Sequence, residues 1–118
     1  MEYMLILGSA EPREQMAPTD PAFAEYMAGW FAFNQKLIDG GHWIGGAQLQ
    51  PVATATTIKR VAGADTIVDG PYAETKEQLG GYYLIEAKDL DEALELAAAM
   101  PFTDAVIEVR PIQYRPQP

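Results

Sequence analysis

The chain has 118 residues, of which 48% are hydrophobic, so we expect one globular domain with a single core rather than a disordered chain. Acidic residues outnumber basic residues 17 to 8, and the formal net charge of −9 repels nucleic-acid backbones and anionic membrane surfaces. The chain has no cysteine, which excludes disulfides, thiolate metal sites and a cysteine nucleophile.

The N-terminus lacks the pattern of a signal peptide. It carries Glu2 where a signal peptide would carry lysines, and the apolar run that follows is too short for the hydrophobic region of such a peptide. No stretch reaches the ~20 apolar residues that are needed to span a bilayer. We therefore expect a cytoplasmic protein with no membrane partner and no nucleic-acid partner.

The first elements that the sequence predicts are a strand and a helix. Residues 4–7 form an apolar run that ends at Gly8, which indicates a buried strand with apolar side chains on both faces. Asp20 and Pro21 indicate a helix start, because a carboxylate can cap free N–H groups and proline fits the first helical position. Apolar residues then recur at three- and four-residue steps up to 40–41, where two glycines are expected to end the helix in a left-handed cap.

The middle of the chain predicts strands and a hairpin. Residues 42–50 alternate loosely and are interrupted by Gly45 and Gly46, which indicates a bulged or bent strand. Residues 56–61 and 66–69 are rich in β-branched side chains and flank a short turn, so they predict a β-hairpin.

The last part of the chain predicts a strand, a helix and a further strand. Residues 82–86 are strongly strand-like and again apolar on both faces. Asp89 and Glu92 form a capping-box arrangement, which starts an alanine-rich helix that is expected to run through Met100. Residues 106–110 alternate as the final strand.

This order predicts an α+β protein with a ferredoxin-like βαββαβ fold, in which two helices cover one face of an antiparallel sheet. We expect one domain over residues 1–113 and a tail at 114–118. The helices leave the other face of the sheet bare, although residues 4–7 and 82–85 carry apolar side chains there. At ~25 cal/mol per Å², exposing several such side chains would cost several kcal/mol, which a second subunit could recover. We therefore expect a homodimer that packs sheet against sheet.

The densest polar segment of the chain lies between residues 69 and 81. This segment holds several carboxylates, a phenol, a hydroxyl and an amine at the end of a strand. Pro71 and the glycines at both ends allow tight turns, which suit a binding loop as well as an ordinary connection. From spacing alone, a solvated turn with Glu74 and Lys76 as surface charges is the favoured interpretation.

The segment 69–85 resembles the signature of the YCII-related proteins of the DGPF type, named for Asp-Gly-Pro-Phe, with Tyr72 in place of the usual Phe. The resemblance covers nearly the whole chain and implies a dimeric α/β-barrel with a ferredoxin-like fold. Further matches are the glycine pair at 45–46, Leu-Gln-Pro at 49–51, Thr-Ala-Thr-Thr at 54–57, the helix start at 89–93 and Ile-Glu-Val-Arg-Pro at 107–111.

The resemblance implies no settled reaction. Some members are similar in fold to muconolactone-isomerase-like and other small ring-handling enzymes, and some lie near genes for extracytoplasmic-function sigma factors. Members of this type often carry a histidine just before the last strand. This chain has Thr103, Asp104 and Ala105 there and departs from that pattern.

The one histidine of the chain, His42, follows the end of the first predicted helix. An imidazole is the usual acid or base near neutral pH, but a histidine at a helix end also serves as a cap. A single histidine with scattered carboxylates makes no recognised metal-ligand spacing, and the chain carries no dinucleotide- or phosphate-binding motif. We therefore expect no metal and no cofactor.

Two functions from different classes remain open. The first is a small enzyme of isomerase or lyase type that binds a small molecule in a cleft. In it Asp69 acts as general base or orienter, Lys76 or an arginine holds substrate charge, and His42 is a second catalytic candidate. The alternative is a non-catalytic ligand-binding or regulatory module, linked to sigma-factor-dependent transcription. Tyr82 and Tyr83 should lie on opposite sheet faces, so one of them lines the cleft or the dimer interface. The candidate ligand-binding residues are Tyr72, Glu74, Thr75, Lys76, Tyr82 and Arg110.

Overall fold

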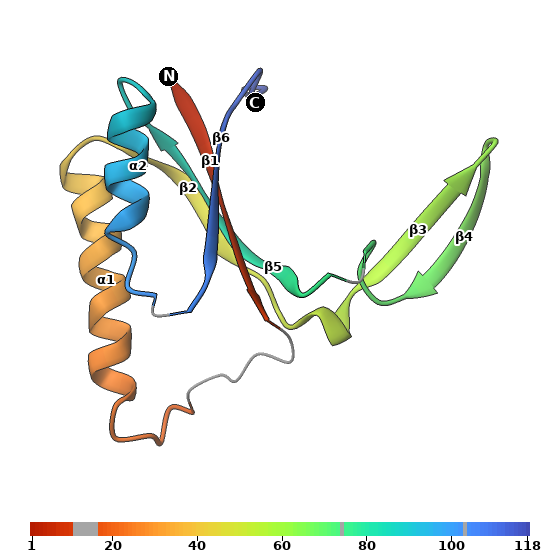
Figure 1. The fold of residues 1–118 in the computed structure, drawn as a ribbon, viewed down its shortest axis with the longest axis horizontal. Coiled ribbons are helices and arrows are strands. Elements are labelled where there is room, and N and C mark those ends of the chain that lie inside the picture. The colour runs from red at the N-terminus through yellow and green to blue at the C-terminus, as the bar shows by residue number, and fades with distance from the viewer. Residues whose placement is uncertain (11–16, 74, 103) are drawn as a thin grey trace.

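The computed structural model of the protein describes residues 1–10, 17–73, 75–102 and 104–118 (Figure 1). No helix in these ranges is both long enough and apolar enough to cross a membrane. In chain order the elements are β1 (Glu2–Ala10), α1 (Phe23–Asp39), β2 (Trp43–Gln48), the short 3₁₀ helix η1 (Val52–Thr54), β3 (Thr56–Val61), β4 (Ala64–Asp69), β5 (Glu77–Glu86), α2 (Leu90–Ala98) and β6 (Val106–Pro111).

An antiparallel sheet in the strand order β2-β5-β1-β6 forms the body of the molecule. Both helices lie on one side of this sheet (Figure 1). Strands β3 and β4 pair only with each other and form a separate hairpin between β2 and β5 in the sequence. The α+β class and the ferredoxin-like fold expected from the sequence are therefore confirmed.

The core lies between the sheet and the helices. Tyr3 and Leu5 on β1 and Ile85 on β5 are at most 2% exposed, and Tyr3 is directly opposite Ile85 in the strand register. Helix α1 adds Phe33 and Leu37, which are four residues apart and therefore lie on one side of the helix. The apolar positions of β1 and β5 on this face thus hold the helices to the sheet.

The start of α1 differs from the sequence expectation. The helix begins at Phe23 with Ala22 at the N-cap, so the prediction that Asp20 caps it and Pro21 opens it is wrong. Asp20 instead closes a turn before the helix: its carboxylate accepts a hydrogen bond from the Ala22 N–H at 2.8 Å, and its carbonyl accepts one from the Phe23 N–H at 3.0 Å. The carboxylate still satisfies a free N–H group, but in the preceding turn.

The end of α1 is the predicted left-handed cap. Gly41 has a φ of 72°, and its N–H donates to the Ile38 carbonyl at 3.1 Å. The His42 N–H donates to the Leu37 carbonyl at 2.8 Å. These two bonds make a Schellman motif, which satisfies the last helical carbonyls and turns the chain into β2.

The predicted bulge of β2 is present, because its register with β5 shifts between Trp43 and Gly45. At α2 the capping box also forms: the Asp89 carboxylate accepts a hydrogen bond from the Glu92 N–H, and the Glu92 carboxylate accepts one from the Lys88 N–H, both at 2.9 Å. The helix ends at Ala98, two residues before the expected end.

The predicted hairpin is confirmed, with β4 starting at Ala64 rather than at residue 66. Ala62 and Gly63 connect the strands and have φ values of 50° and 81°. Two central residues with positive φ make a type I′ turn, whose twist matches that of the paired strands. The hairpin projects from the sheet on the side away from the helices (Figure 1).

The C-terminal tail is held to β1 by one ion pair for which the sequence offered no signal. Arg115 donates to both carboxylate oxygens of Glu2, at 2.8 and 3.0 Å. This hydrogen bonding lowers the pKa of Glu2. The tail therefore lies close to the start of β1.

A substitution in the core measures how much the helix packing contributes. Leu37→Ala should lower the free energy of unfolding by about 2–5 kcal/mol, because it removes a fully buried side chain and leaves a cavity. Ile38, the next residue, is half-exposed, so Ile38→Ala should cost only about 0.5 kcal/mol. Urea unfolding followed by circular dichroism measures both. Equal losses in the two variants would contradict the described core.

Candidate functional site

A cleft of about 560 Å³ lies between α1 and the face of the sheet that the helices cover. Its volume is within the range of ~300–1,000 Å³ that is usual for small-molecule pockets. Most of its large lining side chains are aromatic: Phe23, Tyr26, Trp30, Phe31, Trp43, Tyr83 and Phe102.

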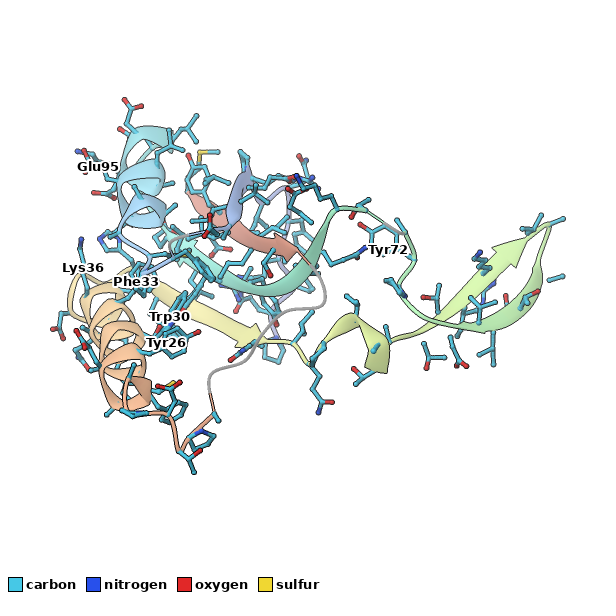
Figure 2. The ribbon with its side chains drawn as sticks, turned by 60° about the horizontal axis from the view of Figure 1, so that its bottom comes forward. Tyr26, Trp30, Phe33, Lys36, Tyr72 and Glu95 are labelled. Atoms are coloured by element: carbon cyan, nitrogen blue, oxygen red, sulfur yellow. The ribbon has the colours of Figure 1, made fainter. Side chains whose placement is uncertain are left out.

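Helix α1 forms one wall of the cleft because its lining residues recur at three- and four-residue steps. This spacing places Phe23, Tyr26, Met27, Trp30, Phe31 and Asn34 on neighbouring turns of one helix side. Figure 2 shows Tyr26 and Trp30 on the side of α1 that faces the sheet.

Ring contacts fix the aromatic walls without a ligand. Trp30 meets Phe102 edge to face, with ring centroids 4.8 Å apart, and Phe33 in the same manner at 6.2 Å. Tyr83 contacts Phe33 at 5.4 Å and Trp43 at 5.8 Å, again edge to face. Such pairs are favourable beyond the burial of their area, so the cleft is largely preformed.

Glycines leave the sheet side of the cleft open. Gly8, Gly46, Gly80 and Gly81 all line it. At Gly46 an added Cβ would lie 2.7 Å from the Tyr82 carbonyl oxygen, and at Gly81 it would lie 2.9 Å from the Ala47 carbonyl oxygen. Larger residues would therefore push β2 and β5 apart. Gly46, one of the two glycines that predicted a bend in β2, also makes room in the cleft.

The polar groups of the cleft are few and uncharged. The Tyr83 hydroxyl donates to Asn34 Oδ1 at 2.6 Å, and burial raises the pKa of this phenol. Trp30 Nε1 is buried and has no hydrogen-bond partner among the described residues. None of the described lining residues is Asp, Glu, Lys, Arg or His. A charged ligand would lose its hydration here without meeting an opposite charge from these residues.

Of the site residues predicted from the sequence, Tyr82 lies at this cleft. The ring of its neighbour Tyr83 contacts Phe33 of α1, so strand alternation directs the Tyr82 side chain to the helix-free face. The expected division of the two tyrosines between the sheet faces follows from this geometry.

Asp69 and Tyr72 lie away from the cleft, at the base of the hairpin. Asp69 is exposed at the end of β4 opposite Thr56, and its carboxylate accepts no hydrogen bond from the described residues. Tyr72 is 83% exposed and borders a second, shallower hollow of about 370 Å³, next to Pro71 and Gln78. Figure 2 shows Tyr72 well separated from Tyr26 and Trp30.

The end of the polar segment belongs to β5, which begins at Glu77, and the described residues before it form the connection from β4. Gln78 is buried, and its side-chain amide donates to the carbonyls of Ala73 and Thr75, both at 3.0 Å. The Thr75 hydroxyl donates to the Glu77 carbonyl at 2.5 Å. Lys76 is exposed, and Glu74 and Thr103 lie outside the described residues.

His42 and Arg110 lie in two further places. The His42 ring Nδ1 is 2.8 Å from the Glu86 carbonyl oxygen, so it joins the end of α1 to β5. Arg110 forms an ion pair with Glu108 on β6. The structure thus does not gather the predicted site residues at one point, and no group of three acids or histidines in the described ranges could hold a metal ion.

The aromatic cleft was missed because the apolar side of α1 was assigned to the core. The signal was a difference in length: α1 has 17 residues and α2 has 9. The first half of α1 extends past α2 (Figure 1), so its apolar side chains border open space instead of a second helix.

The chain is similar to known proteins over most of its length. A family model described as the YCII-related domain matches residues 1–114. An uncharacterized protein of Rhizobium meliloti (strain 1021) is 43% identical over 90 residues, which is 72% of this chain and 72% of the relative.

The environment of Tyr83 can be tested by alkaline titration. Because burial raises its pKa, this phenol should ionise after exposed tyrosines, which ionise near pH ~10. Its contribution to stability is present below the pKa of the unfolded chain and is lost as the pH rises through the higher pKa of the folded chain. Tyr83→Phe should remove the last step of the tyrosinate absorbance titration, and Tyr114→Phe, at a 78% exposed position, should leave it. A last step that survives Tyr83→Phe would contradict this environment.

Proposed function

The chain belongs to the YCII-related domain family, and on this premise we propose that it binds an uncharged, largely apolar small molecule in the cleft between α1 and the sheet. The observation that carries the proposal is a preformed cleft of small-molecule size with aromatic walls and no charged group among its described lining residues. A flat ring system fits this chemistry best, because it can pack against ring faces and edges that are already fixed.

The hydrogen-bonding groups of the cleft narrow the ligand class further. A buried N–H without a partner costs about 1–3 kcal/mol, so Trp30 Nε1 favours a ligand that carries a hydrogen-bond acceptor. The side-chain amide of Asn34 and the Tyr83 hydroxyl, which are hydrogen-bonded to each other, add polar groups to an otherwise apolar wall. We therefore favour an aromatic compound with one or two oxygen or nitrogen acceptors and no net charge.

The same residues support binding rather than proton transfer. A general base near neutral pH is usually a histidine or carboxylate, and the described lining of the cleft contains neither. This favours the non-catalytic ligand-binding alternative. Isomerase or lyase activity with Asp69 as base, the regulatory link and the cytoplasmic location all stay predictions.

A dye titration tests the cleft. N-phenyl-1-naphthylamine is an uncharged aromatic dye, and both tryptophans of the chain line the cleft, so binding should quench the tryptophan fluorescence. Tyr26→Ala and Phe31→Ala should each weaken dye binding about tenfold, because each removes apolar contact area. These side chains are 42% and 63% exposed, so the fold should be retained.

Control variants distinguish dye binding in this cleft from dye binding at the polar segment 69–81. Tyr114→Ala removes an exposed aromatic ring away from the cleft and should leave dye binding unchanged. Asp69→Asn and His42→Ala should also bind the dye normally. Lost binding in Asp69→Asn together with normal binding in Tyr26→Ala would overturn the cleft and move the site to the base of the hairpin.

We also propose a homodimer through the helix-free face of the sheet. Met4 lies opposite Leu84 and Ile6 lies opposite Tyr82, and all four side chains are partly exposed. None of the four belongs to the core cluster or packs against it. At ~25 cal/mol per Å², covering this apolar face favours association by several kcal/mol.

Light scattering tests the dimer. At micromolar concentration the protein should have twice the mass of one chain. Ile6→Lys should give the mass of a single chain, because it places a charge at the centre of the proposed interface, whereas Glu95→Lys on the exposed side of α2 should stay dimeric. A wild-type protein with the mass of one chain would contradict the dimer.

A further inference from the structure

The β3–β4 hairpin, residues 56–69, extends from the body of the molecule as an arm. It projects on the side of the sheet away from the helices, which is the side of the helix-free face (Figure 1). The radius of gyration is 16.4 Å, compared with about 13–14 Å for a compact chain of this length. An isolated two-stranded hairpin is marginally stable in water, so an arm of this kind calls for a covering partner.

The arm carries an exposed apolar pair on one face. Ile58 lies opposite Ile67 in the register, and these side chains are 61% and 70% exposed. Arg60 and Asp65, the next pair toward the tip on the same face, form two hydrogen bonds of 2.5 and 2.9 Å. An apolar centre beside a satisfied polar pair is the composition of a protein interface.

We propose that the arm closes over a second copy of this chain, which packs on the helix-free face, and that Ile58 and Ile67 are buried against that partner. The inference rests on the homodimer proposed above and assigns a second, separate part of its interface. Each six-residue strand of the arm is about 20 Å long, and a four-stranded sheet is about 15–20 Å wide. One arm therefore spans one partner sheet.

The area of the surfaces favours a second copy held by both of them. From strand spacing and rise, the helix-free face measures about 20 by 20 Å and one face of the arm about 20 by 10 Å. The sheet face alone gives about 400 Å², which is half of the ~800 Å² per partner in a standard stable interface. Adding the arm brings the total to about 600 Å², close to what a stable dimer needs.

The charge distribution points to the same partner. Two chains with a net charge of −9 repel each other, so self-association requires a surface where charges are balanced. The arm carries two cations, Lys59 and Arg60, against two acids, Asp65 and Asp69. At the sheet, arginines pair with acids: Arg110 with Glu108 and Arg115 with Glu2. Arg60, Arg110 and Arg115 thus lie on the two surfaces that we assign to the dimer, whereas Lys59, opposite Thr66, lies on the other face of the arm.

Photocrosslinking from the arm tests the contact directly. The chain has no cysteine, so Ile67→Cys provides a unique thiol for benzophenone maleimide. Irradiation of a mixture of ¹⁵N-labelled and unlabelled chains should give a two-chain product that contains both isotopes. Its crosslinked peptides should map to β1, β2 or β5 of the second chain. Glu95→Cys on the exposed side of α2 (Figure 2) should give no two-chain product.

A charge variant gives a second, independent readout. The double variant Ile58→Lys/Ile67→Lys should weaken the dimer at least hundredfold in sedimentation equilibrium, because two buried isoleucines are replaced by charges. Thr66→Lys adds a charge on the opposite face of the same arm and should change the dimer constant less than threefold. Normal dye binding in the cleft shows that each variant is folded.

The outcomes distinguish failure of the proposed arm contact from failure of the proposed dimer. A wild-type protein that is monomeric in light scattering overturns both. A wild-type dimer whose Ile67 crosslinks stay within one chain, or reach only α1 or α2 of the second chain, overturns the arm and leaves the sheet-to-sheet dimer. Unchanged association in the double lysine variant also overturns the arm.

Discussion

The pairing of β1 with β5 at the centre of the sheet is the constraint on which the rest of the molecule depends. Because side chains alternate along a strand, the register that places Leu5 opposite Tyr83 also places Met4 opposite Leu84. The first pair belongs to the face that packs against the helices, and the second pair lies on the helix-free face. Both faces are apolar, so the two sides of one strand pair create a core and a partly exposed apolar surface.

The cleft arises because the two helices that cover one face of the sheet differ in length. Helix α2 has 9 residues and packs over only part of that face, whereas α1 has 17 and extends past it. The sheet beside the first half of α1 is lined by glycines, which supply no side chains to fill the space. Aromatic side chains from α1 and β5 therefore meet across an open volume. The ring contacts of Trp30 and Tyr83 hold that volume open as a pocket.

The sequence predicted those features that depend on local chemistry. The left-handed cap at Gly41, the capping box at Asp89 and the alternating strands each have a short-range cause, and together they were sufficient for the fold class. The resemblance to YCII-related proteins pointed to the family that the comparisons show. The start of α1 was misplaced by a few residues because Asp20 can cap a turn as well as a helix.

The candidate site could not be predicted in the same way. Asp69 and Tyr72, from the segment that is densest in polar residues, lie at the base of the hairpin, and Gln78 on β5 donates its side-chain amide to the carbonyls of Ala73 and Thr75 in the loop before it. The cleft instead depends on the relative lengths of two helices and on glycines from three strands, which no local motif reports. The aromatic residues that α1 supplies to the cleft resemble core residues in the sequence because they lie on the same helix as the buried Phe33 and Leu37.

The most direct test of the cleft as the binding site is an NMR titration with N-phenyl-1-naphthylamine. The chain has two tryptophans, Trp30 and Trp43, and both line the cleft, so their indole N–H signals report on it alone. Both indole signals should shift on binding, while the amide signals of residues 56–69 stay in place. Shifts confined to residues 69–78 with unmoved indole signals would contradict the assignment of the site to the cleft.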